Sequence, residues 1–390
     1  MGNDPSVMEL KSAVKREQVM AQGNRGKFEN IICQLRKQQT GKTFALKVGR
    51  QNLFVIGISQ MKQSGSELSP IDVTFLTDNQ EERNVNLGGP NREFFTLFLN
   101  EFLNQKQLDM FEGKGGFLLP THNKARADWF YYLGKAIVLS LLSEGPGFPY
   151  FPPFIVSFLR DQEFLHELST IYVVNTYLVQ HIDAVNAAVC QDEIDKIIGE
   201  ESERFTDYCG WSSVERITLS NRMRYIQTLL QWYLIDKRKE SLEEIKRGLR
   251  TLSFLESTKE YEEFCRFFVT RDKRATTALY IKDKLLPKVA ELSTNNAQEE
   301  NTKALTTELL KDLNDEEAAK LFQFITGLDD LPVHDFSMNV GFNRSEPRAE
   351  LPKATTCLQY LHLPLGNKSK MELYASFNKA LTLGKLGFAE

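Results

Sequence analysis

The sequence predicts an α+β fold that is mainly helical and carries a few short strands. Several long segments repeat apolar residues at helical spacing, whereas Ser69–Phe75 alternates apolar and polar residues as a half-buried strand does. Hydrophobic residues make up 42% of the 390 residues and charged residues 26%, which is ordinary for a chain that buries a large core. A chain of this length is expected to form roughly two or three domains.

Helical patterns are found along most of the chain. The first begins at a capping-box pattern, Ser6–Glu9, and ends before Gly23. Another begins near Leu53, and the next follows Pro90, which suits a first helical turn. That helix is expected to bury four phenylalanines: Phe94, Phe95, Phe98 and Phe102. The remaining patterns are Ala127–Ser143, Asn221–Trp232, Glu243–Leu252, Asp315–Ile325 with Asn314 as its cap, and Lys370–Leu383.

Three further segments interrupt the helical patterns. Gly113–Gly116 is glycine-rich without nucleotide-binding spacing, so it predicts a hairpin turn. Ser293–Asn301 is polar and predicts a loop. The segment Phe336–Phe342 predicts a short strand.

Composition argues against several functional classes. The net charge of −4 gives no basic excess of the kind that a nucleic-acid-binding surface shows. The five cysteines (33, 190, 209, 265 and 357) are scattered and lack metal-ligand spacing, so we expect a reducing compartment, no metal and no cofactor. The most apolar run, Trp129–Leu142, contains Lys135 and is too short to span a bilayer. We expect a cytoplasmic protein without a transmembrane segment, with the nucleus as an alternative location.

The cysteine that stands out is Cys357, in a short stretch between Pro352 and Pro364. The neighbouring threonines and Leu358 favour extended structure, which Pro364 ends. Most free cysteines are small buried hydrophobic residues, so one interpretation of Cys357 is core packing. A second is a protease nucleophile served by His362, but five residues of chain separation do not set catalytic geometry.

The order of four sequence blocks resembles the HECT family of ubiquitin ligases over about residues 48–390. The four blocks are Ile71–Phe75 followed by Leu87–Phe95, Asn221–Tyr225 through Lys246–Gly248, Leu321–Gly327 with Leu331–Pro332, and Leu351–Cys357 with Leu361–Pro364 and Gly387–Phe388. Each block is weak alone, but their order and the position of the Thr-Cys pair near the end are specific.

This resemblance implies a fold of two lobes. It places a mostly helical N-lobe at 48–270, which contains a subdomain at about 190–268 that docks the ubiquitin-conjugating enzyme. A hinge near 269–280 leads to a mixed α/β C-lobe at 271–390, and residues 1–47 form a helical, basic extension. By position, Tyr225 and Leu229 match family residues in the groove for the conjugating enzyme.

The implied partners are ubiquitin, a ubiquitin-conjugating enzyme and a substrate protein. The implied site contains Cys357 as the thioester nucleophile, together with Thr356, Phe388 and Glu390. Cys357 would accept ubiquitin by thioester exchange, which needs no general acid because a thiolate is a good leaving group. A substrate lysine would then attack and lose a proton, a step that a nearby carboxylate can assist; Glu390 is the first candidate, before Glu346 and Asp335.

The sequence also departs from the family pattern. Many members have histidine two residues before the cysteine, where this chain has Thr355. The tail after Phe388 is short, and the segment at about 155–215 is shorter than is usual. These differences leave an alternative open: a HECT-like scaffold that binds a conjugating enzyme or ubiquitin without transfer.

Overall fold

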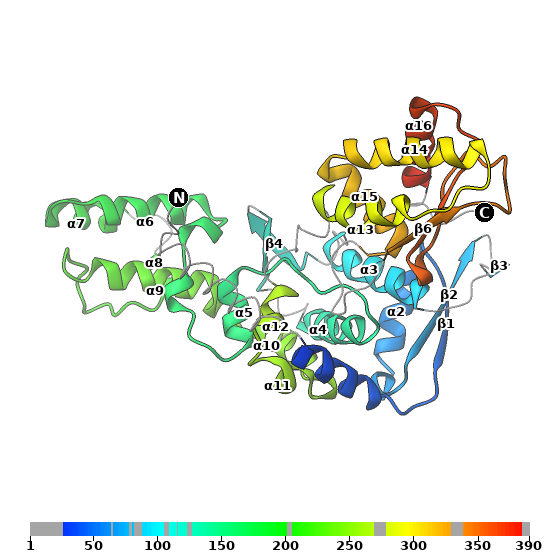
Figure 1. The fold of residues 1–390 in the computed structure, drawn as a ribbon. Coiled ribbons are helices and arrows are strands. Elements are labelled where there is room, and N and C mark those ends of the chain that lie inside the picture. The colour runs from blue at the N-terminus through cyan, green and yellow to red at the C-terminus, as the bar shows by residue number, and fades with distance from the viewer. Residues whose placement is uncertain are drawn as a thin grey trace, which may run out of the picture.

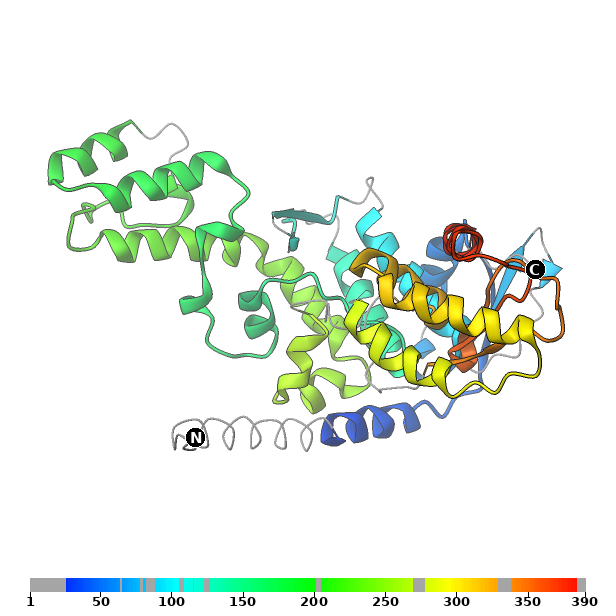
Figure 2. The same cartoon turned by 45° about the horizontal axis from the view of Figure 1, so that its top comes forward.

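The computed structural model describes residues 26–383 except for 64, 78–79, 82–87, 105–108, 115, 123–126, 201–204, 269–277 and 329–337. Within these residues, helices dominate and three small sheets complete an α+β fold. The predicted helix from Ser6 to about Gln22 lies outside the described residues, and so does most of the predicted hinge at about 269–280. Figures 1 and 2 show two packed bodies of helix and sheet, with a helical extension reaching away from the first.

The first body contains a helix at 26–37 and the elements β1 to α5 and α10 to α12. Their bounds are β1 (Phe44–Gly49), α2 (Leu53–Met61), η1 (Ser66–Leu68), β2 (Ile71–Thr77), β3 (Gln80–Glu81), α3 (Gly89–Asn104), β4 (Phe111–Lys114), β5 (Phe117–Pro120), α4 (Ala127–Leu142), α5 (Pro153–Leu159), α10 (Lys239–Leu249), η6 (Thr251–Ser253), α11 (Phe254–Thr258) and α12 (Glu262–Arg266).

The extension and the second body follow different stretches of the chain. The extension and its approach contain η3 (Leu165–Glu167), η4 (Thr170–Tyr172), α6 (Thr176–Ala187), α7 (Gln191–Gly199), α8 (Phe205–Tyr208), α9 (Arg222–Leu234) and η5 (Asp236–Arg238). The second body contains α13 (Ala278–Ala290), α14 (Ala297–Asp312), α15 (Asp315–Thr326), β6 (Asn339–Phe342), β7 (Lys353–Thr355), η8 (Thr356–Leu358), β8 (Tyr360–Leu363) and α16 (Lys370–Leu383).

The buried apolar side chains form two clusters. The first gathers residues from Phe28 to Phe268 and includes the extension, whereas the second gathers residues from Ala278 to Leu381. In the first sheet β1 pairs parallel with β2, and β2 pairs antiparallel with β3. In the second cluster's sheet β8 is central, parallel to β6 and antiparallel to β7. Each cluster therefore has its own core.

Several predicted elements are confirmed. The predicted strand at Ser69–Phe75 is β2, and the glycine-rich segment at Gly113–Gly116 joins the hairpin strands β4 and β5. All four phenylalanines of α3 are buried. The cap of α15 is a full capping box, in which the Asn314 side chain accepts from the backbone of Glu317 and the Glu317 side chain accepts in return.

Other predictions need correction. The predicted loop Ser293–Asn301 is confirmed at 293–296 but wrong from Ala297, where α14 begins and the Asn296 side chain accepts from the Glu299 amide at 2.9 Å. The helix predicted to reach Leu252 ends at Leu249, and Leu252 and Ser253 both have positive φ. The parallel strand β1 was not predicted, since its partner lies far along the chain.

The crossing of α4 and α10 sets the packing of the first cluster. Gly134 of α4 and Gly248 of α10 meet face to face: a Cβ at residue 248 would lie 2.8 Å from the Cα of Gly134 and 2.7 Å from the amide nitrogen of Lys135. Glycine at both positions lets the helix backbones touch. Any side chain at the crossing has to push the two helices apart.

We expect Gly248→Ala to lower the free energy of unfolding by about 1–3 kcal/mol, because the added methyl overpacks this backbone contact. Thermal or urea unfolding would measure the loss. Gly199→Ala is the matched control, since a Cβ there meets nothing within 4 Å. The control should be neutral or more stable by up to about 1 kcal/mol. Equal behaviour of the two variants would contradict the role of the α4–α10 contact.

Candidate active site

The predicted nucleophile Cys357 lies in a one-turn 3₁₀ helix, η8, between strands β7 and β8. The expected extended structure is therefore wrong for Thr356 and Leu358, although β8 does end at Leu363, just before Pro364. Gln359 has φ 48° and ψ 45°, and this left-handed residue ends the turn so that β8 can pair antiparallel with β7. The side chain of Cys357 lies outside the described part of the structure.

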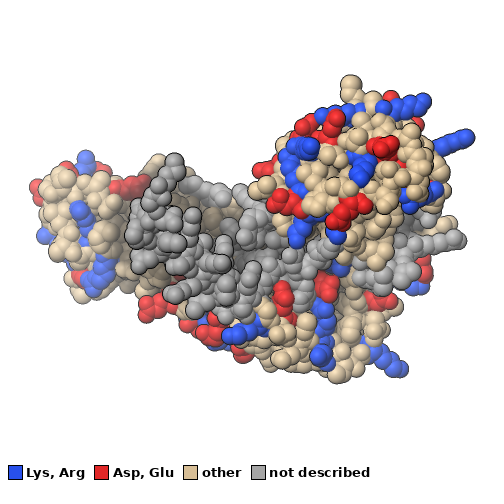
Figure 3. All heavy atoms as spheres, in the orientation of Figure 1, with Lys and Arg blue, Asp and Glu red and all other residues tan. Residues whose placement is uncertain are grey.

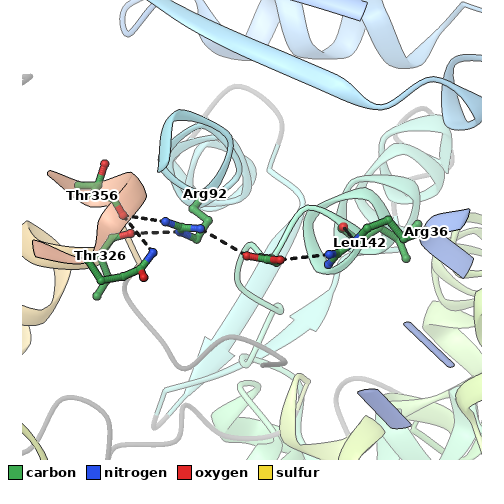
Figure 4. A network of polar contacts seen from close by, with 7 residues as sticks. Arg36, Arg92, Leu142, Thr326 and Thr356 are labelled. Carbon is green, nitrogen blue, oxygen red and sulfur yellow. Dashed lines mark hydrogen bonds and ion pairs between the residues drawn. The ribbon is translucent and has the colours of Figure 1, made fainter. Parts of the chain in front are cut away.

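A buried arginine of α3 contacts the peptide that precedes Cys357. Nη2 of Arg92 donates to the carbonyl oxygen of Thr356 at 2.7 Å, and Nε donates to that of Thr326 at 3.4 Å (Figure 4). Arg92 is 1% exposed. In the sequence, Arg92 stands out only as part of the block Leu87–Phe95 that resembles the family. The feature that could have identified it is a single cation in a phenylalanine-rich helix. The predicted site residue Thr356 therefore contributes its backbone carbonyl to the contact with Arg92.

Two side chains behind Arg92 extend the network. Glu144 lies just after α4 and contacts Nη1 of Arg92 at 3.5 Å and Nη1 of Arg36 at 3.1 Å. Nε of Arg36 also donates to the carbonyl oxygen of Leu142 at 2.6 Å (Figure 4). Polar contacts therefore run from the helix at 26–37, past the end of α4 and the start of α3, to the cysteine segment.

An imidazole lies beside Thr355, the position at which many family members carry histidine. Nε2 of His362 is 2.9 Å from Oγ1 of Thr355, because residues 355 and 362 lie on the same face of the paired strands β7 and β8. Burial, with a smaller effect from the Lys353 charge, lowers the pKa of His362. The ring is therefore neutral at pH 7. Strand pairing brings these two side chains together, and their sequence separation gave no sign of it.

Of the carboxylates predicted to assist lysine transfer, only Glu346 lies within the described part of the structure. Glu390 and Phe388 lie outside the described residues, as does Asp335. Glu346 is exposed and pairs with Lys353 at 2.8 Å, and the hydrogen bond from Lys353 lowers the pKa of this carboxyl group. A lowered pKa makes Glu346 a weaker proton acceptor.

Tyr225 and Leu229, predicted to contact the conjugating enzyme, are both fully buried in α9. The hydroxyl of Tyr225 is 2.9 Å from Nε2 of His181, and its ring packs edge to face against Trp211. In this structure neither Tyr225 nor Leu229 presents its side chain to a partner. Helical spacing alone did not show that this face of α9 is covered by α6 and the loop before α9.

Exposed apolar side chains instead gather at the end of the extension. Arg222 donates to the carbonyl oxygen of Ala188, and Gln191 donates to that of Ile217 at 3.0 Å, so these two loops lie side by side. We call the exposed apolar residues of these loops and of the start of α9 the tip surface; they are Val189 (80% exposed), Val214 (93%), Leu219 (38%) and Met223 (61%).

Charges on the second body are mixed in sign. Figure 3 shows Lys and Arg side chains interspersed with Asp and Glu side chains over this body, at the upper right. Pairs such as Lys320 with Glu316, at 2.6 Å, contribute to this pattern. Within the described residues, no helix is long and apolar enough to cross a membrane, and no group of three or more His, Cys, Asp or Glu side chains is placed to hold a metal ion.

We expect the stability of the extension to fall as the pH decreases from about 6.5 towards 4. Burial lowers the pKa of His181 to about 4, whereas an unfolded histidine titrates near 6.5. The unfolded state therefore binds the extra proton in this window, which costs at most about 3 kcal/mol of stability. Thermal melts at pH 7.5 and 4.5 would measure it. His181→Gln should show a smaller decrease between the two pH values, and an equal decrease would mean that His181 is charged in the folded state.

The chain is similar in sequence to a known protein family and to two known proteins. The chain matches the HECT-domain (ubiquitin-transferase) family over residues 96–389. It is 23% identical over 273 residues to the G2/M phase-specific E3 ubiquitin-protein ligase of Macaca fascicularis and, equally, to that of Homo sapiens. The aligned region covers 67% of this chain and 37% of each relative, so the chain spans little more than a third of their length. Because the family match extends over most of the chain, the protein belongs to the HECT family of ubiquitin-transferase domains.

Proposed function

We propose that this chain is a ubiquitin-protein ligase that accepts ubiquitin from a conjugating enzyme as a thioester on Cys357 and passes it to a substrate lysine. The observation that carries the proposal is the family match, which runs through the β7–η8–β8 segment that holds Cys357. The named relatives are E3 ubiquitin-protein ligases, which supports the same reaction class.

Thioester exchange is the first step. The Cys357 thiolate attacks the thioester carbonyl carbon, a new carbon–sulfur bond forms, and the bond to the conjugating enzyme's cysteine breaks with departure of its thiolate. The leaving group is already good, so the step needs orientation more than a general acid.

In the second step a lysine amine attacks the Cys357 thioester and loses a proton, and the cysteine thiolate leaves. The neutral ring of His362, beside Thr355, can accept that proton, although the pKa values of His362 and Glu346 are both lowered, which weakens each group as a base. Loss of the pH dependence of lysine transfer in His362→Gln would support this role, and an unchanged profile would exclude it. Phe388 and Glu390 remain proposed tail residues of the same step.

The two-lobe division is part of the same proposal. Separate hydrophobic clusters support the division into an N-lobe and a C-lobe, proposed at 48–270 and 271–390, although the first cluster already begins at Phe28. The extension α6–α9 lies partly within the proposed docking subdomain, 190–268. We propose that the tip surface, rather than the buried Tyr225 and Leu229, contacts the conjugating enzyme.

A scaffold that binds ubiquitin or a conjugating enzyme without transfer is the second candidate. Thr355 in place of the family's histidine favours it, because this position adjoins the turn that holds Cys357. The two candidates differ in one observable, which is whether ubiquitin becomes covalently attached to Cys357.

We expect a thiol-sensitive ubiquitin adduct when the protein is mixed with ubiquitin, activating enzyme and a panel of conjugating enzymes, then resolved on non-reducing gels. Cys357→Ala should abolish the adduct, because the acceptor sulfur is lost. Cys33→Ala is the matched control, since Cys33 is a half-buried cysteine of the helix at 26–37, outside the tip surface, and it should retain the adduct. No adduct across a broad panel would favour the scaffold.

Replacing Val189 and Met223 with aspartate should raise the conjugating-enzyme concentration needed for half-maximal adduct formation by about tenfold or more. Desolvated apolar anchors contribute about 1–2 kcal/mol or more each to an interface, and 1.4 kcal/mol is a factor of ten. Ile171→Asp is the control, since Ile171 is an exposed apolar residue of η4 outside the tip surface (61% exposed). If the control weakens adduct formation as strongly, the tip surface is not the docking site.

A further inference from the structure

Arg92 carries a positive charge at a place where water does not reach it. Its side chain is 2% exposed, and the carbonyl oxygens of Thr326 and Thr356 accept hydrogen bonds from its guanidinium. Both carbonyls come from the second body, whereas Arg92 sits on α3 of the first. A buried cation is costly unless it is hydrogen-bonded, so this side chain is tied to the position of both segments.

The two carbonyl oxygens that accept hydrogen bonds from Arg92 belong to residues at the end of one helix and the start of another. Thr326 is the last residue of α15, where helix carbonyls lack intrahelical partners and the helix dipole favours a cation. Thr356 is the first residue of η8, and its carbonyl carbon is bonded to the amide nitrogen of Cys357. A second bond joins the same surfaces, because Oγ1 of Thr96 donates to the carbonyl oxygen of Gly327 at 3.0 Å. The start of α3 therefore contacts the end of α15 through two hydrogen bonds and the cysteine segment through one, from Arg92 to Thr356.

One ion-pair contact of Arg92 is with Glu144, whose carboxylate lies 3.5 Å from Nη1 of the arginine. Glu144 has φ 61°, a left-handed conformation that is uncommon for residues other than glycine, and its carboxylate lies between Arg92 and Arg36. This conformation ends α4, because the amide of Gly145 donates to the carbonyl oxygen of Ser140 at 2.8 Å and that of Glu144 to the carbonyl oxygen of Leu141 at 3.4 Å, as in a Schellman motif. Figure 4 shows the two arginines on opposite sides of this contact, with Arg92 directed towards Thr326 and Thr356.

We propose that Arg92 is a positioning residue for the lysine-transfer step: it fixes the peptide before Cys357 at the start of α3, and Glu144 keeps the guanidinium aimed at that peptide. This inference rests on the proposed function. It adds a residue that contacts no reacting atom and acts through the backbone of Thr356.

The arrangement of the bodies indicates which step depends on this contact. Figures 1 and 2 both show α6–α9 extending away from the body that holds α13–α16. Receipt of ubiquitin from an enzyme docked on the extension does not require the cysteine segment to stay at α3. Attack by a lysine does require a fixed thioester, since misplacement of reacting atoms by about 1 Å can cost a hundredfold in rate.

Single-turnover measurements on the full chain test the proposal. Thioester formation and discharge to free lysine are timed separately for the wild type, Arg92→Gln, Arg92→Lys and Glu144→Gln. We expect Arg92→Gln to slow discharge by about tenfold or more, the effect of losing a charge-assisted hydrogen bond, and to leave formation unchanged. Arg92→Lys should lie between this variant and the wild type, because an ammonium is a point charge without the planar fork.

Arg160→Lys is the matched control for loss of a buried arginine. Arg160 is 6% exposed and its Nε donates to the carbonyl oxygen of Lys259 at 2.5 Å; both residues lie in the first body, after α5 and after α11. This variant should lower stability without changing the ratio of the discharge and formation rate constants. An unchanged ratio in Arg92→Gln, or a ratio that shifts equally in Arg160→Lys, overturns the proposal.

Hydrogen exchange without ubiquitin separates this proposal from the proposed function. The amides of residues 353–363 should exchange faster in Arg92→Gln and Glu144→Gln than in the wild type, and at the wild-type rate in Arg160→Lys. Unchanged exchange in the Arg92 and Glu144 variants overturns the role of Arg92 whether or not ubiquitin is transferred. Faster exchange in the Arg92 and Glu144 variants, together with no adduct in the wild type, would instead reject only the ligase function.

Discussion

Helix α4 is the constraint on which the remaining packing depends, because it is in contact with its surroundings along its whole length. Gly134 allows α10 to touch its backbone, and Lys135 donates to the carbonyl oxygen of Met61 and pairs with Glu67. Past its last turn, Glu144 meets the two arginines that lead to the cysteine segment. A shift of α4 would therefore move α10 and the Arg92 contact together.

The sequence correctly predicted those elements that are stabilised by residues close to one another in the chain. The capping box at Asn314, the four buried phenylalanines of α3 and the hairpin at Gly113–Gly116 depend on residues a few positions apart, and the structure has all three. The predicted α+β class follows from such elements. Strand β1 could not be predicted in the same way, because its parallel partner β2 supplies its hydrogen bonds from more than twenty residues away.

The candidate site was predictable only in part for the same reason. Sequence resemblance singled out Cys357, but the 3₁₀ turn around it depends on Gln359 adopting a left-handed conformation, for which glutamine has no marked preference. The approach of His362 to Thr355 follows from strand register. Arg92 and Thr356 are 264 residues apart, and only the packing of two clusters joins them. Tyr225 was placed on the correct helix, but its burial depends on neighbours that periodicity does not identify.

The left-handed conformation of Gln359 has a consequence for how the cysteine turn can vary among homologous chains. A residue branched at Cβ is disfavoured at φ 48°, whereas asparagine or glycine adopts this region readily. The residue two places after the cysteine therefore restricts the substitutions that this turn tolerates, independently of any role in chemistry. An amino-acid preference at that position in an alignment would record the shape of the backbone rather than contact with a substrate.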